Sequence, residues 1–322
     1  MAIGGQMPPG TPCTREPLVD AITGFLTHMQ VPGVGAMRPT IERVIDDAGQ
    51  GALEELRRRL EQSGSEWSYC PKDPLARRLH HVLADRVLRE VPALLGAEHL
   101  DAVAGKPMVI VANHLSYSDA NAIEVILHLS GRHELADRLA VVAGPKVYSD
   151  LRRRFSSLCF GTIKTPQSAE RSTDSTMTPR EVAAAARRSI DAAVARLARG
   201  EAVLVFPEGT RSRSGQMQPF LPGVTRYFSD ADVAILPVGV WGTEALFPIG
   251  EHAITPLAIT LRVGRPIRAG ALTAGARGDR RLAMDCLGFA VGALLPPAYR
   301  GVYAATSVHN DAARHLHGVL FG

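Results

Sequence analysis

The spacing of apolar residues changes near residue 105 of this chain. Before that point, apolar side chains recur at intervals of three and four, which predicts helices over residues 18–29, 40–61 and 74–89. After it, short apolar runs follow turn signals such as Gly105-Lys106-Pro107, a pattern typical of buried parallel strands. The runs predicted as strands are 108–112, 139–143, 202–206, 233–237 and 259–263.

Helical patterns separate these predicted strands. The clearest begins at Thr178-Pro179-Arg180-Glu181, a capping box with proline at the first helical position, and ends before Gly200. Such alternation predicts an α/β fold over residues 101–322, with a mixed, mostly parallel sheet flanked by helices. Residues 1–100 are predicted to form a small helical domain that precedes it. Ligands of such sheets bind beyond the carboxyl ends of the strands, so we expect the chemistry there.

Polar residues directly follow the first of these strands, in Asn113-His114-Leu115-Ser116-Tyr117-Ser118-Asp119. His114 and Asp119 would stand about 140° apart on one helix, so they meet only if His114 lies in the loop and Asp119 in the first helical turn. The carboxylate would then orient the imidazole, whose other nitrogen takes a proton from a hydroxyl. The alternative is that both residues cap the following helix, which the spacing alone favours.

A second polar segment follows the strand at 202–206 and reads Pro207-Glu208-Gly209-Thr210-Arg211-Ser212-Arg213. Guanidinium groups pair bidentately with phosphate oxygens, so Arg211 and Arg213 indicate an anion site. A solvated turn is the alternative for any charged loop. That alternative is weaker here because the segment follows a buried strand.

Composition narrows the possible partners. The chain has 36 Lys and Arg against 32 Asp and Glu, a net charge of +4, which favours small anionic partners or an acidic carrier protein over nucleic acid. The four cysteines form no C-x-x-C pair, so we expect neither a disulfide framework nor a metal site. Without a transmembrane stretch or a secretory signal, a cytoplasmic protein is predicted, with peripheral membrane contact left open.

The two polar segments together resemble the hallmark of the glycerophospholipid acyltransferase family, N-H-x4-D followed about ninety residues later by F-P-E-G-T-R-S. Here they read NHLSYSD and FPEGTRS, and Ile235-Leu236-Pro237-Val238 looks like the family's later apolar-Pro-apolar strand. The resemblance covers roughly residues 100–270. It implies transfer of a fatty acyl group, without a cofactor, from acyl-CoA or acyl-carrier protein to a phosphorylated glycerol acceptor.

The resemblance also implies roles for individual residues. His114 would be the general base and Asp119 its partner. The acceptor pocket would be shaped by Glu208, Gly209, Thr210, Arg211 and Ser212, with Arg211 and Arg213 on the phosphate. In the family's second motif, which here reads FGTIKT over residues 160–165, Lys164 would replace the usual arginine with a point charge.

The acceptor stays open between glycerol 3-phosphate and 1-acylglycerol 3-phosphate. The N-terminal helices and the stretch AGPKVYSDL at 143–151 look similar to the soluble plastid type that acylates glycerol 3-phosphate, whereas FPEGTRSRSG is closer to the bacterial lysophosphatidate type. The altered second motif leaves room for an acyltransferase with a specialised metabolite as acceptor. A non-catalytic acyl-lipid or carrier-protein binding module is a further alternative, which the retention of His114 and Asp119 disfavours.

A basic segment, Leu151-Arg152-Arg153-Arg154-Phe155, lies outside both motifs. Arginines beside apolar residues suit an acidic carrier protein or an anionic lipid surface. We favour the simpler interpretation that these arginines lie on a solvated helix face.

Overall fold

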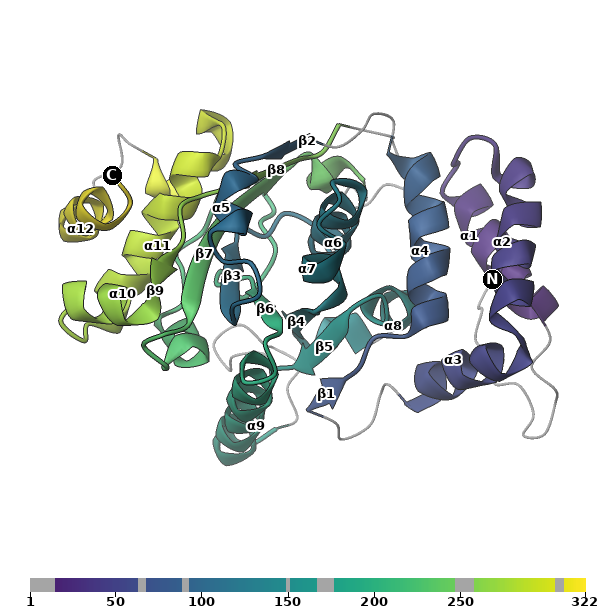
Figure 1. The fold of residues 1–322 in the computed structure, drawn as a ribbon, viewed down its shortest axis with the longest axis horizontal. Helices are drawn as coiled ribbons and strands as arrows, with labels where there is room; N and C mark the ends of the chain where they lie inside the picture. Colours follow the sequence, from purple (N-terminus) through teal and green to yellow (C-terminus); the bar gives the residue numbers. More distant parts are fainter. Residues whose placement is uncertain are drawn as a thin grey trace.

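A computed structural model describes residues 15–62, 68–88, 93–148, 151–166, 177–246, 258–304 and 310–322. Its centre is one sheet with the strand order β1-β5-β4-β6-β3-β7-β8-β2, and β9 pairs with β7 (Figure 1). The strands are β1 (Tyr69–Cys70), β2 (Ala93–Leu95), β3 (Met108–Ala112), β4 (Leu139–Ala143), β5 (Gly161–Lys164), β6 (Ala202–Val205), β7 (Ala234–Trp241), β8 (Thr260–Val263) and β9 (Ile267–Arg268). The pairs β1–β5, β7–β8 and β7–β9 are antiparallel and the other described pairs are parallel, which confirms the mixed, mostly parallel sheet.

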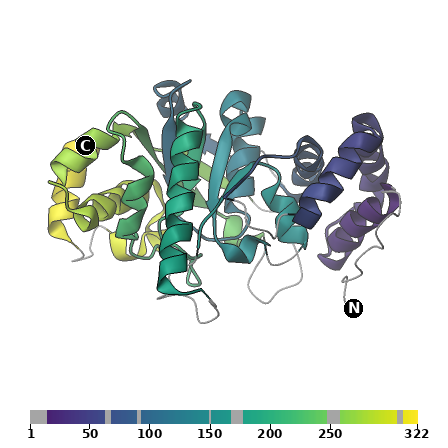
Figure 2. The ribbon, with the colours of Figure 1, turned by 90° about the horizontal axis from the view of Figure 1, so that it is seen from below.

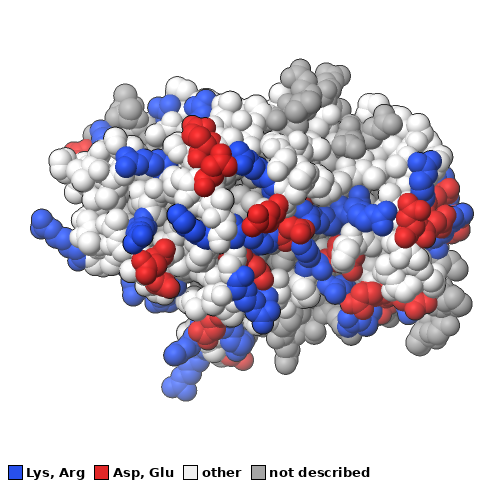
Figure 3. All heavy atoms as spheres, in the orientation of Figure 1, with Lys and Arg blue, Asp and Glu red and all other residues white. Residues whose placement is uncertain are grey.

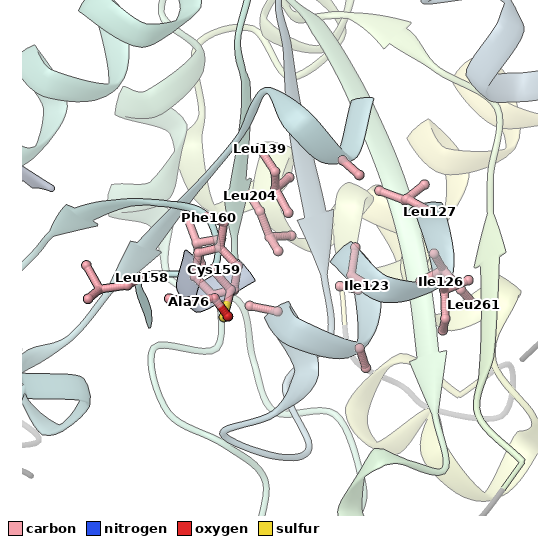
Figure 4. Close-up of a cluster of buried hydrophobic side chains, with 14 of the residues drawn as sticks. Ala76, Ile123, Ile126, Leu127, Leu139, Leu158, Cys159, Phe160, Leu204 and Leu261 are labelled. Atoms are coloured by element: carbon pink, nitrogen blue, oxygen red, sulfur yellow. The ribbon is translucent and has the colours of Figure 1, made fainter. Parts of the chain in front are cut away.

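Helices cover both faces of the sheet. Alternate residues of a strand point to opposite faces, and the apolar residues on both faces of the central strands pack against helices. Met108 and Ile110 belong to one hydrophobic cluster, with α4 (Pro74–Val87) and α6 (Asp119–Leu129). Val109 and Val111 belong to the other, with α9 (Pro179–Leu197) and α11 (Arg280–Leu294). Figure 4 shows part of the first cluster, where side chains of α6 join those of the sheet.

The chain places its first and last helices at opposite ends of the molecule (Figures 1 and 2). At one end lie α1 (Arg15–His28), α2 (Val34–Ala48) and α3 (Gln50–Gln62), and at the other α10 (Ala269–Gly275), α11 and α12 (Asp311–Phe321). Buried residues of α1 and α2 share one hydrophobic cluster with β3 and β7. The division at residue 100 stays a prediction.

The predicted helical region before the sheet is present, but the sequence pattern did not indicate β1 and β2, which join the main sheet. Strands of two and three residues are too short to leave an alternating pattern. The predicted helix over 40–61 is also two helices, α2 and α3. Gly49 lies between them with φ of 81° and ψ of 166°, a backbone conformation that other residues rarely adopt and that ends α2, while the apolar spacing continues across the break.

Other boundaries differ less from the sequence pattern. β3 and β4 have the predicted bounds, and β6 and β8 agree within one residue. β7 continues past its predicted end at Pro237. Proline has no N–H to donate to a neighbouring strand, but the Pro237 carbonyl accepts a hydrogen bond from the Gly264 N–H (2.9 Å). α4 ends at Val87, and residue 89 of that predicted helix lies outside the described residues.

The helix α9 begins as the capping box predicts. The Thr178 hydroxyl accepts from the Glu181 N–H, and the Glu181 carboxylate accepts from the Thr178 N–H. After α9, Gly200 takes a positive φ of 78° and the chain enters β6. The second polar segment then follows at the carboxyl end of β6.

Short elements complete the described fold: α5 (Glu98–Asp101), α7 (His133–Asp137), α8 (Leu151–Ser157), and the 3₁₀ turns η1 (Pro145–Tyr148), η3 (Pro222–Phe228), η4 (Thr243–Ala245), η5 (Pro297–Tyr299) and η6 (Gly301–Tyr303). Among the described residues, no helix combines the length and the apolar composition needed to cross a membrane. Figure 3 shows acidic and basic side chains adjoining one another at several places on one face.

Candidate active site

Asn113 anchors the loop that follows β3. Its side chain is buried and bonds to the backbone of the neighbouring strand β7 in the manner of a peptide group. The Asn113 Nδ2 donates to the Val240 carbonyl (2.8 Å), and its Oδ1 accepts from the Val240 N–H (2.9 Å). These bonds fix the point at which β3 ends, and therefore the position of His114.

His114 and Asp119 meet in the way that the sequence predicts, with His114 in the loop and Asp119 opening α6. The His114 Nδ1 lies 2.8 Å from the Asp119 Oδ2, and the two side chains are 17% and 0% exposed. Because an ionised carboxylate only accepts hydrogen bonds, Nδ1 carries the hydrogen and Nε2 carries the lone pair. This is the geometry of a general base with an orienting carboxylate.

The Asp119 carboxylate is held by further donors. Its Oδ2 also accepts from the backbone N–H groups of Leu115 (2.6 Å) and Ser116 (2.9 Å), so the loop closes on the same carboxylate that orients His114. Its Oδ1 accepts from the Thr243 hydroxyl (2.5 Å), which arrives from η4 after β7. A buried carboxylate needs such partners to remain ionised.

No sequence pattern identified Thr243 as a residue of the candidate site. It follows Asp119 by 124 residues, and it is a single threonine next to Gly242. Gly242 has φ of 93°, and a Cβ there would lie 2.6 Å from the Ala258 carbonyl oxygen. The only feature of the sequence that marks this position is Gly242, the glycine that follows the apolar-Pro-apolar strand and precedes Thr243.

Replacing Thr243 by valine should destabilise the protein and slow catalysis. The methyl group leaves Oδ1 of Asp119 buried without this donor, at a cost of about 1–3 kcal/mol in the free energy of unfolding. Thr243→Ser keeps the hydroxyl and should stay near wild type. Denaturant unfolding measures the difference, and equal stability of the valine and serine variants would contradict the assignment.

The second polar segment holds the backbone of His114 from both sides. The His114 N–H donates to the Glu208 Oε1 (2.8 Å), and the His114 carbonyl accepts from the Ser212 N–H (2.7 Å). The other Glu208 oxygen accepts from the Gln218 N–H (2.8 Å), and the Glu208 side chain is 0% exposed. Both residues are buried, and their hydrogen bonds hold the backbone of His114. Their role in shaping the acceptor pocket, which the resemblance implied, stays a prediction.

Burial raises the pKa of Glu208 to about 7, although hydrogen bonds from the backbone of Gln218 and His114 act in the opposite direction. Since the folded pKa lies above its ordinary value of 4.5, the folded state binds more protons than the unfolded state between these values. The contribution of this proton binding to stability is full below about pH 4.5 and is lost as the pH rises through 7.

A comparison with Glu208→Gln should reveal this dependence. The free energy of unfolding of the wild type, minus that of the variant, should fall by roughly 3 kcal/mol between pH 4 and pH 8, because glutamine does not titrate. Denaturant unfolding at several pH values measures it. A difference that does not change with pH would contradict the raised pKa of this carboxyl group.

Arg211 lies beside the loop of His114. Its Cζ is 4.3 Å from the ring centroid of Tyr117, which stands between His114 and Asp119 in the chain. The turn that leads to Arg211 requires Gly209, which has φ of 69° and whose N–H donates to the Phe206 carbonyl. The Phe206 ring stacks on the His114 imidazole at 4.4 Å between centroids. The loop of His114 and the segment of Arg211 therefore lie side by side.

The other predicted substrate-binding residues are less closely placed. Gly209, Thr210 and Arg213 are exposed on the loop after β6, and their contact with an acceptor stays a prediction. Lys164 ends β5, which is separated from β3 by β4 and β6. At about 4.8 Å per strand, it lies roughly 14 Å across the sheet from the strand of His114. In the described ranges, no group of three or more His, Cys, Asp or Glu side chains is arranged to hold a metal ion.

The segments that contain His114, Asp119 and Arg211 lie within the part of the chain that matches a known protein family. Residues 91–241 match the family model described as Acyltransferase. The matched residues include both motifs, and this finding confirms their resemblance to the acyltransferase family.

Individual relatives agree with that family. The chain is 24% identical over 189 residues to 1-acyl-sn-glycerol-3-phosphate acyltransferase LPAT1, chloroplastic, of Arabidopsis thaliana, covering 56% of this chain and 46% of the relative. It is 24% identical over 159 residues to the BAT2 enzyme of the same printed activity from Brassica napus, covering 49% and 40%. The chain thus spans less than half the length of these curated relatives. The crystal structure of the acyltransferase PlsC from Thermotoga maritima is 18% identical with a TM-score of 0.40, covering 80% of this chain and 88% of that one.

Proposed function

We propose that this chain transfers a fatty acyl group from an acyl thioester to a hydroxyl of a phosphorylated glycerol, with 1-acylglycerol 3-phosphate as the leading acceptor. One observation carries the proposal. The loop of Arg211 holds the backbone of His114 on both sides, so a base and an anion-binding group share one rigid framework. A phosphate on Arg211 would keep a nearby hydroxyl of the same molecule within reach of His114.

The reaction follows from this arrangement. Nε2 of His114 removes the proton of the acceptor hydroxyl as its oxygen attacks the thioester carbonyl carbon. The tetrahedral intermediate then collapses, the C–S bond breaks, and the imidazolium returns the proton to the leaving thiolate. Asp119 stays ionised throughout and stabilises the imidazolium, as in other carboxylate-oriented bases. A general base contributes about 10²–10⁴ in rate, and no covalent enzyme intermediate is required.

Different observations bear on the acceptor and on the donor. The FPEGTRSRSG segment and the printed names of the relatives favour lysophosphatidate, whereas the N-terminal helices favour glycerol 3-phosphate. Acyl-CoA and acyl-carrier protein both supply the required thioester. The cytoplasmic location, the peripheral membrane contact and the preference against nucleic acid remain predictions.

A mass-spectrometric product assay tests the proposal. Purified protein is incubated with acyl-CoA, or with acyl-carrier protein, and with glycerol 3-phosphate, lysophosphatidate or a neutral alcohol. We expect a new ester with a phosphorylated acceptor only. An ester or amide formed only with a non-phosphorylated metabolite would favour the specialised acyltransferase instead. Binding of the thioester without any product would indicate a non-catalytic binding module.

A further inference from the structure

The Tyr117 ring lies close to a second guanidinium group besides that of Arg211. The Cζ of Arg153 lies 4.5 Å from the ring centroid, and that of Arg211 lies 4.3 Å from it. Tyr117 follows β3, Arg211 follows β6, and Arg153 belongs to α8, which follows β4 and η1. Since β4, β6 and β3 are neighbours in the sheet, these side chains come from three adjacent strand ends and meet at one aromatic ring.

The two distances limit the separation of the guanidinium carbons to at most about 8.8 Å. Two positive charges this close repel each other, and an anion between them gains from both. A phosphate accepts bidentate hydrogen bonds of about 2.8 Å from a guanidinium, and its several oxygens allow one phosphate at the edge of the Tyr117 ring to accept from both. Cation–π contact with Tyr117 restricts both arginines before the anion arrives.

The position of Arg153 is further restricted by its own loop. Its Nη1 donates to the Lys146 carbonyl (3.1 Å) in η1. The neighbouring Arg152 points elsewhere, because its Cζ lies 5.5 Å from the ring centroid of Phe25 in α1. Arg152 is exposed, as the prediction of a solvated helix face expects, whereas Arg153 is half-buried and contacts the Tyr117 ring beside the candidate active site.

We infer that Arg153 is a second phosphate-binding residue, and that Arg153, Tyr117 and Arg211 form a two-arginine clamp for the phosphate monoester of the acceptor. The inference rests on the proposed function for the identity of the acceptor. A phosphate monoester carries nearly two negative charges near neutral pH, which two guanidinium groups match better than one. The clamp thus gives Arg153 the role that the resemblance implied for Lys164.

Direct binding tests the clamp without requiring turnover. Calorimetry measures the Kd of 1-hexanoylglycerol 3-phosphate, glycerol 3-phosphate and inorganic phosphate for the wild type and for Arg153→Ala, Arg153→Lys, Arg211→Ala and Lys164→Ala. Arg152→Ala is the matched control, since it removes the same charge from the same helix. Thermal unfolding verifies that each variant is folded.

We expect Arg153→Ala and Arg211→Ala each to raise the Kd of the phosphate monoester at least about tenfold, the loss typical of a charged hydrogen bond. Arg153→Lys should recover part of the affinity, and Arg152→Ala should remain within about twofold of wild type. In the acyl-transfer assay, Arg153→Ala should raise KM for the acceptor with little change in kcat. Binding of inorganic phosphate but not of the esters would limit the site to a free anion.

Three results separate this inference from the proposed function. Unchanged binding in Arg153→Ala, with weaker binding in Arg211→Ala or Lys164→Ala, would overturn the clamp and leave the proposed function intact. Loss of phosphate binding in Arg153→Ala, in a protein that acylates no phosphorylated acceptor, would keep the clamp and overturn the proposed function. A wild-type protein that binds none of the three probes would overturn the clamp.

Discussion

Replacing His114 by alanine should lower kcat for acyl transfer by about 10²–10⁴ and leave KM for the phosphorylated acceptor nearly unchanged. In the proposed mechanism the imidazole removes a proton only in the transition state, whereas the acceptor phosphate binds to other groups. The backbone bonds of His114 to Glu208 and Ser212 do not need its side chain, so the loop should persist. Steady-state kinetics over both substrates measure the two constants.

Two controls make the result specific. The variant should bind 1-hexanoylglycerol 3-phosphate with wild-type affinity, and its thermal unfolding should show a single folded species. Since the imidazole stacks on Phe206, some loss of stability is expected. A folded His114→Ala protein that keeps more than about one-tenth of the wild-type kcat would remove His114 from the mechanism.

Asp119→Asn should show the second-largest effect, a fall in kcat of about 10²–10⁴ at nearly constant stability. The amide is the same size as the carboxylate. Its oxygen can accept from Leu115, Ser116 and His114, and its NH₂ group can donate to the Thr243 hydroxyl. The hydrogen bonds are thus retained while the charge that stabilises the imidazolium is lost. Denaturant unfolding and kcat are measured on the same preparations.

Asp119→Ala is the matched comparison. It removes the acceptor of two buried backbone N–H groups, those of Leu115 and Ser116, and should destabilise the protein by several kcal/mol. We expect Asp119→Ala to be less stable than Asp119→Asn, while both variants lose a similar factor in kcat. If Asp119→Asn retained the wild-type kcat, the carboxylate would have a purely structural role.

Much of the sheet could be predicted because its central strands are buried on both faces. β3 and β4 are uninterrupted apolar runs with turn residues before them, and their predicted bounds are those observed. Edge strands such as β1 have two residues and no pattern to detect. The break between α2 and α3 was missed because apolar residues keep their helical spacing across Gly49, so that periodicity outweighed a single glycine.

In the candidate site, contacts between residues near in the chain could be predicted, and contacts between distant segments could not. The pairing of His114 with Asp119 joins residues only five apart, and the sequence predicted the arrangement that allows it, with His114 in the loop and Asp119 in the first turn of α6. The bonds from Thr243 to Asp119 and from Glu208 to the His114 N–H join segments that only the sheet order brings together. Arg153 approaches Tyr117 because β4 and β3 are separated by only β6, and no spacing in the chain shows this order.

The most direct test of the account is the rate of acyl-thioester cleavage with and without a phosphorylated acceptor, measured in parallel for the wild type and His114→Ala. We predict that the wild type cleaves the thioester only when the acceptor is present, and forms one ester for each thiol released. His114→Ala should bind the acceptor and do neither. Wild-type cleavage at the same rate without acceptor, or undiminished transfer by His114→Ala, would contradict the account.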